Sequence, residues 1–300
     1  MSQATTLEKQ ASFGETSRQD NWWLGPLLTL LGLSAFLIYG NWAAWQDGNF
    51  EIRKEKGSWA VFREKGNYAV APYLSPFYSP LIYDEQSHHA WYHGSLRPTW
   101  LPGWAPFSAG FLILAFPGLF RFTCYYYRKA YYRAFWADPV ACAVGEPRKS
   151  YWGENRLPLI LQNLHRYFMY FALIFLFLLA IDAVHAFWWP TDRSGAPLVE
   201  GAHQIGIGVG TLIMVLNVFL LTCFTLGCNS VRHLVGGRMD CFSCPKNPEN
   251  VKAGYKFWRF STILNERHME WAWLSLFSVG FTDVYIRLCS LGYLTDIRIL

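Results

Sequence analysis

Five long apolar stretches, separated by polar segments, organise this chain of 300 residues. A helix rises about 1.5 Å per residue, so roughly 20 apolar residues cross the hydrocarbon core of a bilayer. The first stretch has no charged residue from Asn21 to Gln46, and it has tryptophans near both ends, which is typical of the lipid–water interface. The pattern predicts five membrane-spanning helices, at about residues 21–46, 99–123, 166–190, 203–231 and 269–291.

Three of these stretches are irregular. Pro117 predicts a kink in the second helix. The fourth stretch is longer than a bilayer requires, which predicts that the helix tilts or projects. The fifth contains Asp283 and Arg287, and their i,i+4 spacing places them on one helix face, where pairing lowers the cost of burial.

The polar segments predict the topology. Residues 1–20 predict a polar tail, and residues 47–98 form a loop whose prolines argue against regular helix. Residues 124–165 and 232–268 are predicted as loops rich in Lys and Arg, and such loops stay in the cytoplasm. We therefore expect an all-α polytopic membrane protein, a bundle of five transmembrane helices in the inner (cytoplasmic) membrane, with its N-terminus in the cytoplasm and its C-terminus outside.

Composition excludes several functional classes. Apolar residues make up 52% of the chain and charged residues 16%, against about 25% charged in a usual soluble domain. The net charge of +5 is too small to indicate a nucleic-acid partner, and seven scattered cysteines are not a disulfide framework. The sequence has no phosphate-binding glycine loop, nucleophile elbow or paired-carboxylate site, so we expect no hydrolytic chemistry and no catalytic residue in this chain.

Four histidines mark the ends of the third and fourth stretches. His165 and His185 stand at the ends of one, and His203 and His233 bracket the next. Consecutive helices run antiparallel, so His165 and His233 form a cytoplasmic pair and His185 and His203 an outer pair. Ionisable groups in membrane segments tend to mark function, and imidazole is the usual axial ligand of six-coordinate haem. The spacing predicts two haem b groups, with the iron of each held by one pair.

Alternatives remain for these histidines. A histidine at a helix end can simply face the lipid headgroups, and His268 is a rival to His233 as the inner ligand. The glycines of the GIGVG segment, Gly206, Gly208 and Gly210, would allow a flat macrocycle to approach, or would serve ordinary helix packing.

Two further groups are weaker indications of metal binding. His88, His89 and His93 cluster in the first loop without acidic or cysteine partners. Cys241 and Cys244 form a lone CxxC, and a zinc or iron–sulfur site usually needs two more ligands. An ordinary surface loop is the favoured interpretation of the CxxC segment.

Four segments carry a resemblance to a known family: FRFTCYYYRKAYYRAFW, LPLILQNLHRYFMYFAL, VRHLVGGR and MEWAWLSLFSVGFTDVYIRL. They resemble the single-chain cytochrome b membrane anchor of succinate dehydrogenase, in its actinobacterial form. The resemblance covers roughly residue 107 to the C-terminus. The long fourth stretch and the Tyr-rich arm depart from the more compact anchors of this family.

The resemblance implies a five-helix anchor with two b haems, on which an iron–sulfur subunit carrying a flavoprotein docks at the cytoplasmic face. Electrons from succinate would then reach a membrane quinone (menaquinone or ubiquinone). A quinone pocket is expected where the basic, aromatic loops meet lipid, and its walls should offer donors for the quinone carbonyls. The candidates, each of which can equally be an interface anchor, are Arg121, Tyr167, His268 and Trp271.

Asp182 and Asp283 can relay protons near the outer side, or serve as structural charges. Two other functions stay open. One is a di-haem cytochrome b of another quinone-linked dehydrogenase or a b561-like carrier, and the other is a haem-free membrane scaffold or transporter subunit.

Overall fold

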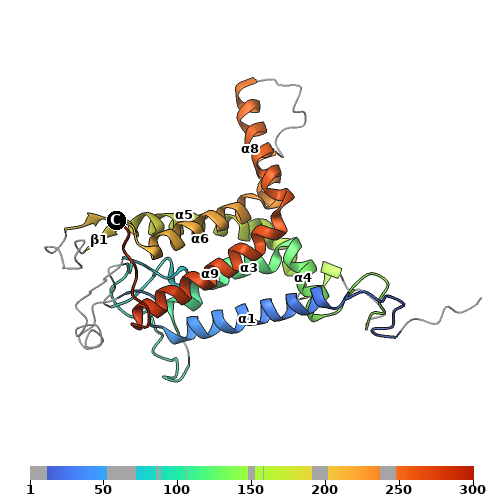
Figure 1. Cartoon of the computed structure of the whole chain (residues 1–300), viewed down its shortest axis with the longest axis horizontal. Coiled ribbons are helices and arrows are strands. Elements are labelled where there is room, and N and C mark those ends of the chain that lie inside the picture. The colour runs from blue at the N-terminus through green and yellow to red at the C-terminus, as the bar shows by residue number, and fades with distance from the viewer. Residues whose placement is uncertain are drawn as a thin grey trace, which may run out of the picture. The chain divides into compact units, whose positions relative to one another are not determined.

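The computed structural model describes residues 12–52, 72–85, 87, 89–105, 107–147, 153–157, 159–190, 202–236 and 248–300, with only the backbone for 248–252. Within these ranges the chain forms eight α-helices, three 3-10 helices and one two-stranded sheet (Figure 1). The chain divides into two compact units. The first comprises Met1–Leu37 with Arg121–His165, and the second comprises Ile38–Phe120 with Arg166–Leu300.

By length and composition, three helices of the described chain can cross a membrane. They are α1 (Leu24–Gln46), α5 (His165–His185) with the 3-10 turn before it, and α6 (Val209–Leu226). A fourth span is possible if α3 (Ala109–Thr123) and α4 (Tyr125–Phe135) act together, although they are bent by 81°. Large apolar side chains on these helices are exposed, as expected of surfaces that face lipid rather than water.

The predicted helix over 203–231 is wrong as a single element. Its first residues form strand β2 (Gln204–Ile205), and the helix α6 begins only at Val209. A turn at 227–228 then separates α6 from α7 (Asn229–Gly236). Glycines at 206, 208 and 227 explain the breaks, because glycine has a low helix propensity and favours helix ends.

The predicted second helix starts ten residues later than expected, at Ala109 instead of residue 99. Prolines crowd the preceding segment, and the Ser108 hydroxyl accepts a hydrogen bond from the Phe111 N–H (3.2 Å), which caps the helix. Helix α3 continues through Pro117, and the chain bends at Cys124.

The segments 124–165 and 232–268, predicted to lie between membrane-spanning helices, contain helices of their own. The first holds α4 and short 3-10 turns, and the second holds α7 and α8 (Pro248–Glu266). Interleaved aromatic and basic residues form amphipathic helices that need not cross a bilayer.

In the first unit, part of the predicted tail is held in place. The Gly14 N–H donates to the Gly145 carbonyl (3.0 Å), and the Gly145 N–H donates back to the Glu15 carbonyl (2.9 Å). The Thr16 hydroxyl donates to the Ala143 carbonyl (2.6 Å). Residues 12–20 are therefore attached to the segment that follows α4.

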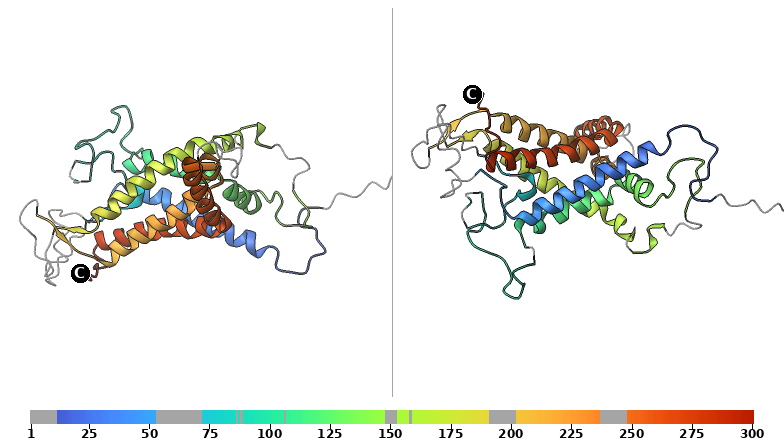
Figure 2. Two further views of the ribbon diagram at one scale, coloured as in Figure 1. Left: turned by 90° about the horizontal axis from the view of Figure 1, so that it is seen from above. Right: turned by 60° about the horizontal axis from the view of Figure 1, so that its bottom comes forward.

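In the second unit, α6 packs along α9 (His268–Ser290), and Figure 2 shows the two side by side from both directions. Aromatic contacts join α3 to its neighbours. The ring centroids of Phe116 and Phe171 on α5 are 4.7 Å apart, and those of Phe120 and Phe224 on α6 are 5.6 Å apart. These contacts place α3, α5, α6 and α9 in one apolar core.

The predicted pairing of Asp283 with Arg287 is confirmed. The Arg287 Nε lies 2.6 Å from the Asp283 carboxylate, and their side chains are 5% and 0% exposed. The hydroxyls of Ser75 and Tyr39 also donate to this carboxylate, and the guanidinium donates to the Ala43 carbonyl (2.9 Å). The pair therefore joins α9 to the end of α1 and to the first loop.

A second buried carboxylate, Asp296, caps α6 from the C-terminal segment. It accepts hydrogen bonds from the Gly210 N–H (2.9 Å), from the Tyr73 hydroxyl (2.7 Å) and from the Tyr285 hydroxyl. Burial, and then the nearby Asp296 carboxylate, raise the pKa of Tyr73 well above its usual value. Tyr73 therefore stays protonated and remains a donor to Asp296.

The GIGVG glycines allow Tyr73, Trp189 and Asp296 to pack closely against the start of α6. A Cβ at Gly208 would lie 2.2 Å from Asp296 Oδ2, and one at Gly210 would lie 2.3 Å from the Tyr73 ring. A Cβ at Gly206 would lie 2.8 Å from Trp189. The space that the sequence suggested for a macrocycle is filled by Tyr73, Trp189 and Asp296.

Replacing Arg287 by Met is expected to destabilise the protein by about 3 to 5 kcal/mol, because Asp283 would stay buried without its counter-ion. Thermal unfolding of the purified protein in detergent measures the loss. Arg18→Met removes the exposed pair with Asp20 and should leave the melting temperature nearly unchanged. Equal melting temperatures for the two variants would contradict the structural role of the buried pair.

Replacing Gly210 by Ala is expected to cost about 1 to 3 kcal/mol, because the new methyl group would overlap the Tyr73 ring. Gly118→Ala in α3 is the matched control, since a Cβ there meets nothing within 4 Å. That control should be neutral or slightly stabilising in the same unfolding assay. A neutral Gly210→Ala would show that α6 and Tyr73 do not pack this closely.

Candidate functional site

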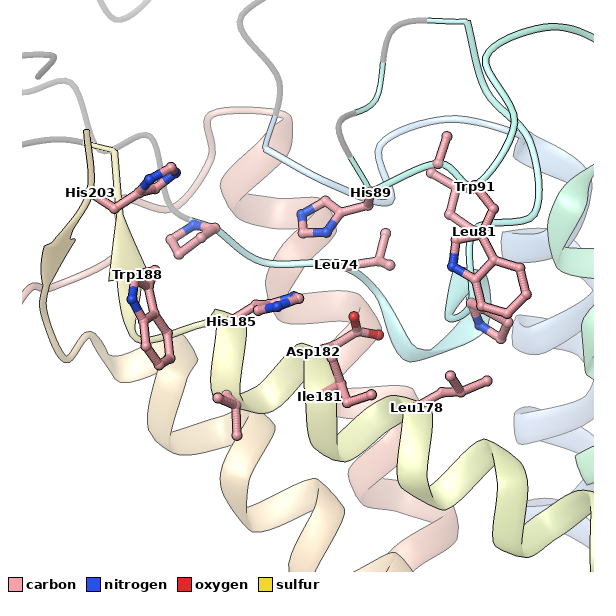
Figure 3. Close-up of a pocket in the computed structure, with 14 residues that line it drawn as sticks. Leu74, Leu81, His89, Trp91, Leu178, Ile181, Asp182, His185, Trp188 and His203 are labelled. Atoms are coloured by element: carbon pink, nitrogen blue, oxygen red, sulfur yellow. The ribbon is translucent and has the colours of Figure 1, made fainter. Parts of the chain in front are cut away.

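A pocket of about 820 Å³ lies in the second unit, at the end of α5 (Figure 3). Its volume is within the range of sites that hold small molecules and cofactors. Its polar lining includes three imidazoles, of His89, His185 and His203, and the carboxylate of Asp182. The rest of the wall is apolar or aromatic: Pro72, Leu74, Pro80, Leu81, Ala90, Trp91, Leu178, Ile181, Val184 and Trp188.

A short hairpin brings His203 back to the end of α5. Helix α5 ends at His185, and strand β1 (Trp188–Trp189) follows at once. It pairs antiparallel with β2, with Trp188 opposite Ile205. The Gly206 N–H donates to the Phe187 carbonyl (2.9 Å), which extends the pairing. His185 and His203, predicted to lie at matching depth, therefore line the same pocket.

His89 is a third imidazole that the pairing argument did not include. Its backbone N–H donates to the Ser87 hydroxyl oxygen (3.2 Å), and the Ser87 hydroxyl donates to the buried Glu51 carboxylate. Figure 3 shows His89, from the first loop, and His185, from α5, facing the same space. A pairing based on helix ends could not find it, because His89 reaches the pocket from a long irregular loop.

The three clustered histidines of the first loop are only partly described, and of the two that are, His89 lines the pocket. His93 does not line the pocket, and His88 lies outside the described residues. In the part of the chain that the structure describes, no group of three or more His, Cys, Asp or Glu side chains is placed to hold a metal ion. Cys241 and Cys244 also lie outside the described residues.

Asp182 holds the first loop to α5. Its carboxylate accepts a hydrogen bond from the Ser79 hydroxyl. Close to Ser79, Tyr78 donates to the Ala43 and Ala44 carbonyls of α1 (3.0 and 3.2 Å). Burial raises the pKa of Tyr78 to about 12, so its hydroxyl remains a donor at neutral pH. The pocket wall formed by the loop is thereby fixed against two helices.

The three inner histidines lie in different surroundings. His165, the first residue of α5, has its Nδ1 2.9 Å from the Thr123 hydroxyl oxygen, within the first unit. In the second unit, His233 lies exposed on α7, whereas the ring of His268 stacks on Phe224 with 5.0 Å between centroids. His185 and His203, the outer pair, line one pocket. His165 belongs to the first unit, whereas His233 and His268 belong to the second.

The four quinone candidates also differ. Arg121, in the first unit, donates through Nη1 to the Tyr127 hydroxyl (2.6 Å). In the second unit, Tyr167 is 61% exposed in the first turn of α5. His268 and Trp271 share the first turn of α9, and the Trp271 Nε1–H is buried with no acceptor among the described residues.

Comparison with known proteins gives the family. The family model described as "Actinobacterial succinate dehydrogenase subunit SdhC" matches residues 54–292. Among solved structures, a chain of the Mycobacterium smegmatis Sdh1 complex in the apo form is 38% identical, with a TM-score of 0.75. The match covers 98% of this chain and 97% of that chain. No curated protein matches.

The family model covers well over half of the sequence, and the solved relative shares both fold and residues along nearly the whole chain. The resemblance inferred from sequence is thus confirmed. This chain belongs to the actinobacterial succinate dehydrogenase subunit SdhC family.

Proposed function

We propose that this chain anchors a succinate dehydrogenase in the cytoplasmic membrane and passes electrons from an iron–sulfur subunit to quinone. The observation that carries the proposal is the family match over residues 54–292. Succinate itself would be oxidised on a flavoprotein subunit, which is joined to this chain through the iron–sulfur subunit. The chain contributes the membrane part of the electron path.

In this proposal five helices cross the membrane, with the N-terminus in the cytoplasm and the C-terminus outside. Helix α9 is the fifth span. Its 23 residues are long enough to cross, and its Asp283 and Arg287 neutralise each other inside the bundle. The basic segments between α3 and α5, and between α6 and α9, then face the cytoplasm. We expect the iron–sulfur subunit to dock there.

The outer pocket fits a haem b by its chemistry. It offers imidazoles from two separate elements, the end of α5 and the hairpin, together with apolar and aromatic walls. His185 and His203 would hold its iron, with His89 as the rival to His203. A bound haem would supply one-electron storage between the subunit partner and quinone, while the residues of this chain orient it.

For the inner haem we propose His165 with His233, and His268 as the alternative to His233. The hydrogen bond between His165 Nδ1 and Thr123 orients the ring, as hydrogen bonds to the far nitrogen do for ligand histidines. His268 is already stacked on Phe224, so its ring direction is fixed by packing.

The quinone site is proposed beside the first turn of α9. The buried Trp271 Nε1–H has no acceptor among the described residues, so a quinone carbonyl would complete its hydrogen bonding. His268 and Tyr167 supply ring surface and further polar groups, and Arg121 is the remaining candidate. A donor held in an apolar wall both positions the quinone and stabilises charge on its oxygen when it is reduced.

Replacing His185 by Ala is expected to remove one of the two haems, and His203→Ala should remove the same one. The pyridine haemochrome assay on the purified complex counts the haem, and the reduced α-band identifies which is lost. His93→Ala, in the first loop and outside the pocket, is the control variant that should keep both haems. Loss with His89→Ala and not with His203→Ala would reassign the ligand, and a parent complex without haem would refute both haem sites.

Replacing Trp271 by Phe is expected to raise the KM for quinone by about fivefold, because one hydrogen bond of roughly 1 kcal/mol is removed while ring packing is largely kept. Succinate oxidation with a soluble dye as acceptor should be unchanged, since it bypasses this chain. Trp273→Phe, two residues along the same helix, is the matched control. An unchanged quinone KM in Trp271→Phe would place the quinone elsewhere.

A further inference from the structure

Helix α8 leaves the helical bundle sideways. It stands out across the direction in which α5, α6 and α9 run (Figure 1), and one view in Figure 2 looks almost along it. Lys256 and Arg259 are among several charged residues in it, and it is not among the helices apolar enough to cross a membrane. If α6 and α9 cross the bilayer, a helix in this direction runs along the bilayer surface.

One face of α8 is fixed to the end of α6. The Ser261 hydroxyl donates to the Leu226 carbonyl (2.7 Å), and the Asn265 side-chain amide donates to the Gly227 carbonyl (2.7 Å). These carbonyls end α6, where the helix itself supplies no partner. Trp258, on the same face, packs so closely on α7 that a Cβ at Gly236 would lie 2.5 Å from its ring.

These contacts also set the depth of α8. Helix α6 has 18 residues, so it is about 27 Å long, close to the thickness of a bilayer's hydrocarbon core. Its last residue, Leu226, therefore lies where the hydrocarbon gives way to headgroups. Ser261 and Asn265 bind at that point, so they hold the base of α8 at headgroup level.

The opposite face of α8 carries apolar side chains at a spacing of three residues. Phe257, Phe260 and Ile263 are 64%, 49% and 57% exposed. Lys256 and Arg259 lie between them and are also exposed. Aromatic and aliphatic groups interleaved with Lys and Arg are typical of helices that lie in the interface of an anionic bilayer.

We propose that α8 is an interfacial helix that binds anionic phospholipid at the cytoplasmic surface of the membrane. Phe257, Phe260 and Ile263 enter the boundary between headgroups and acyl chains, and Lys256 and Arg259 contact lipid phosphates. The inference rests on the proposed membrane role of α6 and α9. It separates α8 from the docking surface for the iron–sulfur subunit, to which the whole segment 232–268 was assigned from sequence.

Spin labels on the assembled complex in lipid nanodiscs test this placement. Cysteines are introduced singly as Phe257→Cys, Phe260→Cys and Ile263→Cys, in a Cys142→Ser parent that lacks the one exposed thiol among the described residues. The Cys142→Ser parent without an introduced cysteine gives the background signal from the other native thiols. Leu216→Cys, exposed on α6, gives the signal expected of a label in lipid. We expect collision with oxygen, which partitions into lipid, and protection from the water-soluble, neutral nickel complex Ni-EDDA, as for the Leu216→Cys label.

Two results overturn the proposal. Collision with Ni-EDDA at the rate of free label in buffer would place the face in water. Protection from both oxygen and Ni-EDDA would mean that another subunit covers it. Quinone turnover of the unmodified complex is measured separately, so failure of the proposed function is distinguished from failure of this placement.

The lipid charge is tested at position 260. Phosphatidylglycerol in the nanodisc should lower the Ni-EDDA collision rate of the Phe260→Cys label at least about twofold relative to phosphatidylcholine alone, because each Lys or Arg at an anionic surface gains about 1 kcal/mol. Lys256→Gln with Arg259→Gln should abolish the difference. Lys129→Gln on α4 is the control that should keep it. An equal rate in both lipids with the native basic residues would refute the phosphate contacts.

Discussion

The ion pair between Asp283 and Arg287 holds together segments that lie far apart in the sequence. A charge inside a membrane protein is costly unless it is paired and hydrogen-bonded, so each donor and acceptor of this pair has to find a partner. Those partners are Tyr39 on α1, Ser75 in the first loop and the main-chain carbonyls of Ala43 and Gly48. The need to satisfy one buried pair thereby fixes where the end of α1 and the first loop meet α9.

The same constraint organises the region around the start of α6 and the end of α5. Asp296 gathers two tyrosine hydroxyls and a backbone N–H of α6, and Asp182 takes a serine hydroxyl from the first loop. The first loop has little regular secondary structure in its described part, yet these carboxylates hold it against the helices. The pocket walls contributed by the first loop are therefore as fixed as those contributed by α5.

Apolar length and charge in the sequence predicted the long helices at 21–46, 166–190 and 269–291 with ends that differ by at most five residues, because about 20 largely apolar residues are typical of a membrane-spanning helix. The pairing of Asp283 with Arg287 followed from their i,i+4 spacing. The limits of α6 could not be predicted in this way, because an apolar stretch has the same hydropathy in a strand, a helix or a turn. Glycines at 206, 208 and 227 determine where the helix begins and ends. Helices α4 and α8 and most of α7 lie in the segments predicted as loops, because their charged residues leave no apolar stretch long enough to indicate a membrane span.

Some features of the candidate site could likewise be predicted from the sequence, and others could not. The grouping of His185 with His203 was predictable, since a short connection between antiparallel elements returns the chain to the same level. His89 was not, because its position depends on Ser87 and Glu51, a contact between parts of a loop 36 residues apart. Asp296 and Tyr73 are separated by 223 residues and belong to no periodic pattern. Long-range polar contacts of this kind leave no local trace in the sequence.

The cap on α6 has a consequence for biosynthesis. Gly210 and Asp296 are 86 residues apart, and Asp296 is made later. Until Asp296 has been synthesised, the Gly210 N–H at the start of α6 lacks the carboxylate that accepts its hydrogen bond. The start of α6 is therefore capped only after the segment that carries Asp296 has been synthesised and has packed against it.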